Sequence, residues 1–424
     1  MLNGKKILLG ITGGIAAYKT TFLVRLFIKA GAEVKVILTE SAGDFVSPLT
    51  LATLSKNPVL SSFASEKKGA EGVKAMDWNN HVELGLWADL MLIAPATANT
   101  LSKMANGTSD NLLLATYLSA KCPVFFAPAM DLDMYKHPSS KVSFEKLERY
   151  GNVMIPATSG ELASGLRGEG RMAEPEDIVD FIQRHLSEGL PLSGKKVLIT
   201  AGPTYEAIDP VRFIGNHSSG QMGFELAQRA ASLGAGVMLV SGPSHLTMGP
   251  NWNSTNESSA ANPATLIPGS IRLERVVSAE EMYEAAHRHY PDADIVICAA
   301  AVSDYRPKSV ADQKIKKKDA EFTIELVKTK DILLSLGKQK QNQYLVGFAL
   351  ETENELENAR AKLAAKNLDA IVLNSLNDEG AGFGTATNKI TFMDTNSEII
   401  PFELKSKAAV AEDIFTEIIK RIDA

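Results

Sequence analysis

Two glycine-rich turns in the sequence have the residue types that bind anions. Gly13 and Gly14 follow a basic pair and the apolar run Ile7–Ile11, and a second such turn follows Lys195–Thr200 and leads through Ser218–Gly223 into a helical pattern. A strand, a turn of small residues and a helix together point backbone N–H groups and the positive end of a helix at a ligand. The sequence therefore predicts two anion sites, one in each half of the chain.

Lysines of the second half could meet a polyphosphate. Lys362 and Lys366 are four residues apart, so that both face one side of a predicted helix. The basic run Lys314–Lys318 follows the predicted strand end Ala300–Pro307. Such a run is more often a solvated surface, but its place after a strand end favours phosphate contact. Together these ammonium groups could neutralise a triphosphate.

Small and polar residues also gather where the predicted strands of the first half end. Thr39, Pro95–Thr100 and Pro128–Met134 each follow an apolar run that is typical of a strand. Strands that alternate with helices imply a parallel, doubly wound sheet, and ligands bind beyond the carboxyl ends of its strands. A Gly-Gly turn alone is often only a turn, but four such strand ends at one edge favour a cofactor crevice.

The same pattern begins again near residue 192, which predicts two doubly wound, Rossmann-like α/β domains in tandem. A helical segment, Pro175–Leu186, would close the first domain, and Ser187–Ser193 has the Gly and Pro of a hinge. We therefore expect domains over 1–190 and 191–424. Gly242–Ser270 lacks periodicity and is expected to be a long exposed loop.

Composition narrows the classes of protein. The 424 residues carry a net charge of −6, which argues against a general binder of nucleic acid or of anionic membranes. No apolar run approaches the ~20 residues of a membrane span, and the early start of the first predicted strand leads us to expect no signal peptide. Cys122 and Cys298 lie in apolar surroundings, so a disulfide framework or a thiolate zinc site is not expected, and a cytoplasmic location is compatible.

Four motifs of the first half resemble the flavin-dependent cysteine decarboxylases, among them the N-terminal half of the bifunctional phosphopantothenoylcysteine decarboxylases/phosphopantothenate–cysteine ligases of coenzyme A biosynthesis. These motifs are Gly10–Lys19, His81–Gly107, Pro128–Tyr135 and Ser159–Met172. The resemblance implies a flavodoxin-like flavoprotein domain that binds FMN, with His81 as the catalytic base. The FMN contacts that it implies are Thr12, Gly13, Gly14, Ile15, Ala16, Thr39, Pro95, Ala96, Thr97, Ala98, Asn99 and Thr100.

In this family the cofactor supplies the redox chemistry. FMN takes a hydride from the carbon that bears sulfur, and the resulting thioaldehyde accepts the electrons left behind when CO2 departs. The enethiolate then takes back the hydride together with a proton. The protein must supply a base, an anchor for the carboxylate and an acid.

Two positions implied to be catalytic depart from the family pattern. Asp131 stands where the family has an Asn that binds the substrate carboxylate. At ~4 Å and an effective dielectric near 20, an ionised Asp would repel that group by roughly 4 kcal/mol, so Asp131 must be protonated, paired with a cation or in contact with something else. Ser164 stands where the family has a Cys that donates a proton, and an alcohol is a much weaker acid than a thiol.

Our hypothesis is that decarboxylation survives with a different acid or with a relayed water. The flap that carries Ser164, Gly160–Gly170, contains four glycines, which suits a mobile lid, although it could also be a plain flexible loop.

The second half, from Ala201–Gly223 through Lys366–Asn374, resembles the phosphopantothenate–cysteine ligase domain. The resemblance implies that CTP forms an acyl-cytidylate with the carboxyl group of 4'-phosphopantothenate and that cysteine then displaces CMP. Asn216 would stabilise this intermediate with Arg212 beside it, and Mg2+ is expected at the triphosphate. Gln221 replaces a Lys that the family directs at phosphate. The residues implied at the nucleotide are Cys298, Ala299, Ala300, Asp304, Lys314, Thr329, Lys330, Asp331, Ile332, Phe348, Lys362 and Lys366.

Two alternatives stay open. An NAD(P)-dependent oxidoreductase would need a G-x-G-x-x-G turn and an acidic residue after the second strand, whereas that strand ends in Thr39. The other alternative keeps the ligase but makes the first half a flavin-fold module whose decarboxylase activity is lost or altered at Ser164. The family also implies homo-oligomers, with a trimer or dodecamer through the flavin domain and a dimer through the ligase domain.

Overall fold

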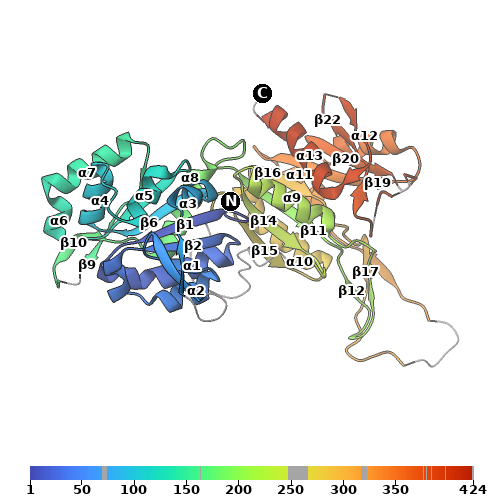
Figure 1. Ribbon diagram of the computed structural model, residues 1–424. Helices are drawn as coiled ribbons and strands as arrows, with labels where there is room; N and C mark the ends of the chain where they lie inside the picture. Colours follow the sequence, from blue (N-terminus) through green and yellow to red (C-terminus); the bar gives the residue numbers. More distant parts are fainter. Residues whose placement is uncertain are drawn as a thin grey trace. The chain divides into compact units, whose positions relative to one another are not determined.

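The computed structural model describes residues 1–68, 74–162, 164–246, 266–316, 322–375, 377–378, 380–382, 384–396 and 398–422 (Figure 1). The chain divides into two compact units. The N-terminal unit is Leu2–Leu186, and the C-terminal unit is Ser187–Ala424 together with Met1. Each unit is described by itself below.

The N-terminal unit is built on a six-stranded parallel sheet. Along the sheet the strands follow the order β3-β2-β1-β6-β7-β8. The strands are β1 (Lys6–Ile11), β2 (Glu33–Leu38), β3 (Val59–Leu60), β6 (Leu90–Ala96), β7 (Val124–Pro128) and β8 (Val153–Met154).

Helices cover both faces of this sheet because its central strands are apolar on both sides. In β1, Ile7, Leu9 and Ile11 pack into one core cluster, while Leu8 packs into the other. On the first side lie α1 (Thr20–Lys29), α2 (Pro48–Ser55) and α8 (Pro175–Ser187). On the second lie α3 (His81–Trp87), α4 (Ala98–Ala105), α5 (Leu112–Ser119) and α7 (Pro138–Arg149).

Short elements connect the strands and helices of this unit. They are η1 (Ile15–Lys19), η2 (Glu40–Asp44), α6 (Leu132–Lys136), the hairpin β4–β5 (Ala64–Lys68 and Lys74–Trp78) and the hairpin β9–β10 (Thr158–Glu161 and Arg167–Arg171). The predicted flap is therefore an antiparallel hairpin with a turn at its tip rather than an open loop.

The C-terminal unit repeats the arrangement with a longer sheet. Its order is β15-β14-β11-β16-β19-β20-β22-β23, and only the pairs β20–β22 and β22–β23 are antiparallel. The strands are β11 (Lys196–Ala201), β14 (Gly236–Ser241), β15 (Ile271–Arg275), β16 (Ile295–Cys298), β19 (Tyr344–Glu351), β20 (Ala370–Ser375), β22 (Thr391–Asp394) and β23 (Ile399–Pro401).

Helices again cover both faces. One core cluster holds α9 (Gln221–Ser232) and α13 (Lys407–Ile422), and the other holds α10 (Ala279–His289), α11 (Ile332–Gln339) and α12 (Glu355–Ala365). The remaining pieces are η4 (Tyr290–Asp292), the pair β21–β24 (Thr387–Asn388 and Lys405–Ser406), and an arm. The arm consists of the pairs β12–β13 (Glu206–Ala207 and Phe213–Ile214) and β17–β18 (Tyr305–Pro307 and Leu326–Lys328) (Figure 1).

The prediction of two tandem Rossmann-like domains is confirmed. Numbered within its own sheet, each parallel core has the order 3-2-1-4-5-6, which is the dinucleotide-fold order, whereas flavodoxins have 2-1-3-4-5. Most of the predicted loop Gly242–Ser270 (247–265) and part of the basic run Lys314–Lys318 (317–318) lie outside the described residues. In the described part, no helix combines the length and the apolar character needed to cross a bilayer.

Candidate active sites

Each unit has a pocket at the carboxyl edge of its sheet, where the strand order reverses. In the N-terminal unit this point lies between β1 and β6, and in the C-terminal unit it lies between β11 and β16. Ligands of open α/β sheets bind at such switch points. The N-terminal pocket takes residues from the loops that follow β1 and β6. The C-terminal pocket takes Thr200 from β11, several residues from the end of β16 and the segment after it, and the rest of its lining mainly from the start of α11, from β19 and from α12.

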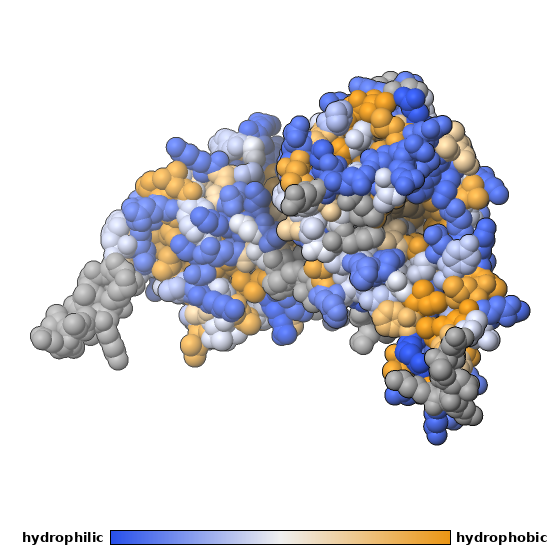
Figure 2. All heavy atoms as spheres, turned by 90° about the vertical axis from the view of Figure 1, so that its right-hand side faces the viewer, coloured by the Kyte–Doolittle hydropathy of each residue, from blue (hydrophilic) through white to orange (hydrophobic). Residues whose placement is uncertain are grey.

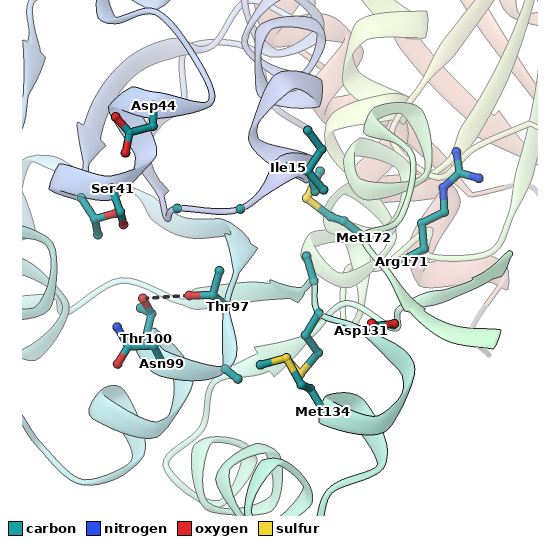
Figure 3. Close-up of a pocket in the computed structure, with 18 of the residues that line it drawn as sticks. Ile15, Ser41, Asp44, Thr97, Asn99, Thr100, Asp131, Met134, Arg171 and Met172 are labelled. Atoms are coloured by element: carbon teal, nitrogen blue, oxygen red, sulfur yellow. Dashed lines mark hydrogen bonds between the residues drawn. The ribbon is translucent and has the colours of Figure 1, made fainter. Parts of the chain in front are cut away.

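The N-terminal pocket is a cavity of about 1340 Å³. The glycine-rich turn forms one wall, and the loop after β6 forms another (Figure 3). The space is larger than a drug-sized ligand needs. The predicted residues that line it are Gly13, Gly14, Ile15, Ala16, Thr39, Thr97, Ala98, Asn99, Thr100, Asp131 and Ser164.

Three of the predicted flavin contacts do not line this pocket. Thr12, Pro95 and Ala96 lie behind its wall, and Thr12 and Ala96 are fully buried. The Thr12 hydroxyl donates to the Pro95 carbonyl at 2.6 Å and accepts from the Thr97 N–H at 3.1 Å. Thr12 therefore joins the loop after β1 to the end of β6. The hydroxyl oxygens of Thr97 and Thr100 lie 3.4 Å apart, and both residues line the cavity (Figure 3).

The turn itself requires glycine. A Cβ on Gly13 would come within 2.2 Å of the Ser41 hydroxyl oxygen and 2.9 Å of the Ser41 carbonyl carbon. The turn thus packs directly on the loop after β2, and Gly13, Gly14, Ile15 and Ala16 line the cavity. This cradle and the cavity's size fit a flavin.

His81 lies outside the pocket. It is the first residue of α3, whose N-terminus is capped by the Asn80 side chain. Its ring meets that of Phe63 edge-on at 6.0 Å between centroids, and its Nδ1 is buried with no hydrogen-bond partner among the described residues. A single copy of the chain therefore does not bring the predicted base to the predicted flavin contacts.

Asp131 and Ser164 do meet. Asp131 is the N-cap of α6, and its Oδ1 accepts hydrogen bonds from the Leu132 N–H at 2.7 Å and from the Ser164 hydroxyl at 3.0 Å. The hairpin β9–β10 thus reaches the base of α6. A Cβ on Gly170 would come within 2.4 Å of the Met130 carbonyl oxygen, so a glycine in β10 allows this approach.

Sequence reasoning missed several lining residues. Ser41 and Asp44 follow Thr39 in the loop after β2, and a strand-end signal could have extended to them; in Figure 3 they lie across the pocket from Asp131 and Met134. The predicted stretch Pro128–Met134 does supply Met130 and Met134 to the lining. The missed residues include Tyr18, Lys19, Glu40, Ser41, Asp44, Lys103, Asp110, Asn111, Glu161, Arg171 and Met172.

The C-terminal pocket is a smaller cavity of about 510 Å³. Ten predicted residues line it, namely Cys298, Ala300, Asp304, Thr329, Lys330, Asp331, Ile332, Phe348, Lys362 and Lys366. Ala299 does not line it, because alternate residues of a strand point to opposite faces of the sheet. Thr200, Val302, Tyr305, Lys328 and Leu333 complete the lining.

The lysines of this pocket are held by different partners. Lys362 donates to the Phe348 carbonyl at 3.0 Å, and Lys366 pairs with Asp331 at 2.8 Å. Burial, together with the neighbouring Lys366 charge, lowers the pKa of Lys362. An incoming anion would relieve this charge repulsion, which makes Lys362 well suited to bind phosphate.

Besides Ala299, three residues implied at the ligase site lie outside this lining. The guanidinium of Arg212 is held by the buried carboxylate of Asp209. The Nε and Nη2 atoms of Arg212 donate hydrogen bonds to that carboxylate at 3.0 Å and 2.6 Å. Lys314 is an exposed residue of the loop after β17. Asn216 donates to the Ala301 carbonyl, at the end of the segment that follows β16. Burial raises the pKa of the Cys298 thiol to about 12, so Cys298 lines the pocket as a neutral group.

Comparison with known protein families also divides the chain into an N-terminal and a C-terminal part. The profile of the family "Flavoprotein" matches residues 1–187, and that of "DNA/pantothenate metabolism flavoprotein C-terminal domain" matches residues 192–422.

Relatives match over most of the chain. The coenzyme A biosynthesis bifunctional protein CoaBC of Bacillus subtilis is 45% identical over 99% of this chain and 97% of that protein. A protein named cysteine/cysteine sulfinic acid decarboxylase, from an unknown prokaryotic organism, is 52% identical over 88% of this chain and 99% of its own length. Among solved structures, the C-terminal domain of a CoaBC protein is 39% identical over 55% of this chain and 99% of its own, with a TM-score of 0.44.

Proposed function

Because the chain belongs to the CoaBC family of bifunctional coenzyme A biosynthesis proteins, we propose that its two pockets carry out two consecutive reactions. The C-terminal unit joins cysteine to 4'-phosphopantothenate through an acyl-cytidylate, with conversion of CTP to CMP and pyrophosphate. The N-terminal unit then decarboxylates the product to 4'-phosphopantetheine with FMN. The location that we propose for these reactions is the cytoplasm.

In the ligase reaction, the C-terminal pocket would hold the nucleotide. The ammonium groups of Lys362 and Lys366 project from one side of α12 and bind the triphosphate, and Phe348 packs on the base. Asn216 stabilises the acyl-cytidylate through its amide. No group of three His, Cys, Asp or Glu side chains in the described part of the chain could hold a metal. We therefore expect Mg2+ to arrive bound to phosphate oxygens and to keep water ligands.

In the decarboxylation, FMN supplies reversible uptake of a hydride when it is bound. The glycine-rich turn and Thr97–Thr100 would hold and orient it. The hairpin β9–β10 excludes water from the pocket, and His81 takes the substrate proton. Because His81 lies outside the pocket of its own chain, we propose that a neighbouring copy supplies it in a trimer or a dodecamer.

The exposed apolar residues support these oligomers. On the N-terminal unit Ile15, Tyr18 and Phe22 are each half exposed or more. On the arm of the C-terminal unit, Val211 and Phe213 are exposed, and Figure 2 shows hydrophobic side chains gathered low in the view, where the arm lies. Exposed apolar groups that cluster mark interaction surfaces, so we propose that the arm makes the dimer contact.

The observation that carries the proposal is the full-length match to bifunctional relatives, combined with a lysine-rich pocket in the unit that would bind CTP. Incubation of the protein with 4'-phosphopantothenate, cysteine, Mg2+ and either CTP or ATP, with all products identified by mass spectrometry, tests it. We expect phosphopantothenoylcysteine and phosphopantetheine with CTP. A protein that leaves CTP unchanged would contradict the ligase proposal.

A second candidate keeps the ligase and gives the N-terminal unit an altered decarboxylase activity. Two observations favour it. Ser164 stands where the family has a cysteine, and a relative 52% identical is named for decarboxylation of cysteine and cysteine sulfinic acid. Release of an oxidised enethiol instead of phosphopantetheine in the same assay would favour this candidate.

A further inference from the structure

Among the described residues, the Asp131 carboxylate of the N-terminal pocket forms hydrogen bonds only with neutral groups. The Leu132 N–H and the Ser164 hydroxyl both donate to Oδ1. In the described part of the chain no ion pair or hydrogen bond reaches Oδ2. One oxygen is therefore fixed by the protein, and the other is left for a ligand.

The cations that line the same pocket have other partners. Lys19 binds Glu174 at 2.9 Å and the Met172 carbonyl at 3.1 Å, and Arg171 binds Glu174 at 2.7 Å. Lys103 binds Asp110. The described lining holds five acidic and three basic side chains, and each of the three basic ones is paired with a carboxylate.

The charge of Asp131 discriminates between two classes of substrate. In an N-acylated cysteine the nitrogen next to the carboxylate is a neutral amide, so Asp131 would meet only the like charge of the carboxylate. In a free amino acid the same carbon carries an ammonium group. That group could donate a charge-assisted hydrogen bond to Oδ2 and offset the repulsion.

We propose that the N-terminal site has a further activity, the decarboxylation of a free thiol amino acid. In this activity Asp131 binds the ammonium group that the amino acid carries on the carbon next to its own carboxylate. Asp131 is the specificity-determining residue, and Ser164 is a positioning residue that holds its Oδ1 when the hairpin β9–β10 covers α6. The inference rests on the proposed flavin-dependent decarboxylation and names a second substrate class for it.

The experiment compares L-cysteine with phosphopantothenoylcysteine in the purified full-length protein. Asp131→Asn removes the charge and keeps the shape, and Asp133→Asn makes the same change at an exposed position of α6 that does not line the pocket. We expect the wild type and Asp133→Asn to release CO2 from L-cysteine. Asp131→Asn should lower kcat/KM for L-cysteine about 30-fold, mainly through KM, and leave the acylated substrate unchanged or improved.

Binding without turnover gives an independent measurement. Calorimetric titration with S-methyl-L-cysteine and with its N-acetyl derivative should show tighter binding of the free amine, and Asp131→Asn should abolish that difference. Equal effects of Asp131→Asn on both substrates, or a wild type that neither binds nor turns over the free amines, would overturn the inference. If both analogues bind as expected but neither substrate loses CO2, the recognition by Asp131 stands and the decarboxylation proposal fails.

Discussion

The two pockets lie at the carboxyl edges of two sheets whose parallel cores have the same strand order, and they differ in charge. The N-terminal pocket is lined by five acidic and three basic side chains, whereas the C-terminal pocket is lined by two acidic and four basic ones among the described residues. The topology thus fixes where a ligand binds, and the side chains at the strand ends decide which ligand it is. A polyphosphate suits the second pocket, and a flavin with a small substrate suits the first.

The largest effect should come from Lys362, which we propose binds the phosphates of the nucleotide. Lys362→Met removes a half-buried ammonium group, and we expect kcat/KM for CTP to fall about 100-fold in a coupled pyrophosphate assay, because hydrogen bonds to charged groups are the strong ones. Lys338→Met, on the exposed side of α11, is the matched control. A change of less than threefold in Lys362→Met would show that this pocket does not bind the phosphates.

Substitution in the glycine-rich turn at Gly13 tests the proposed flavin binding in the N-terminal pocket. Gly13→Ala would force a Cβ against Ser41, and we expect the flavin content of the purified protein, measured by its absorbance, to fall at least about tenfold. The control is Gly43→Ala, in the loop after β2, where a Cβ would meet nothing within 4 Å. If Gly13→Ala keeps its flavin, the turn is not the binding cradle.

The pH dependence of nucleotide binding should show how the basic charge of the C-terminal pocket distinguishes it from the N-terminal pocket. Burial and Lys366 lower the pKa of Lys362, so its ammonium group loses its proton at a lower pH than an ordinary lysine. Binding of CTP should therefore weaken by about threefold or more between pH 8 and 10 in the wild type. Lys362→Arg stays charged in this range, and its KM for CTP should stay level. If the KM for CTP changes with pH in the same way in the wild type and in Lys362→Arg, Lys362 is not the group whose deprotonation weakens CTP binding.

The smallest effect concerns stability. His289 and Arg288 hold the pKa of Glu274 at about 2, so the stabilisation by this carboxylate is complete above its ordinary pKa of 4.5 and is lost as the pH falls toward about 2. Because the group is partly exposed, Glu274→Gln should lower stability by about 1 kcal/mol at pH 7. Calorimetry should show a lower Tm for the C-terminal unit alone. A shift of both transitions would mean that the units do not unfold separately.

Much of the fold could be predicted from local signals. The strand-turn-helix pattern at Gly13 and the repeat at Lys195–Thr200 gave two Rossmann-like domains, because apolar runs and glycine turns act over a few residues. The pairing of the antiparallel strands β22 and β23 and of the hairpin β9–β10 could not be predicted from local signals, because pairing partners depend on contacts outside each strand.

Local sequence signals predicted the sites best at the ends of strands. Thr97–Thr100 and Cys298 line their pockets as strand ends should. Arg212 does not, because Asp209 three residues earlier captures its guanidinium, and a short-range acid–base pair could have signalled this. The linear motif of His81 could not show that its side chain lies outside the pocket of its own chain.

The most direct test of two separate sites is the product profile of Gly13→Ala. The variant is incubated with 4'-phosphopantothenate, cysteine, CTP and Mg2+, and products are quantified by mass spectrometry. We predict that phosphopantothenoylcysteine accumulates in step with CMP and that no phosphopantetheine forms. Loss of CMP formation together with flavin, or phosphopantetheine formed by flavin-free protein, would contradict this account.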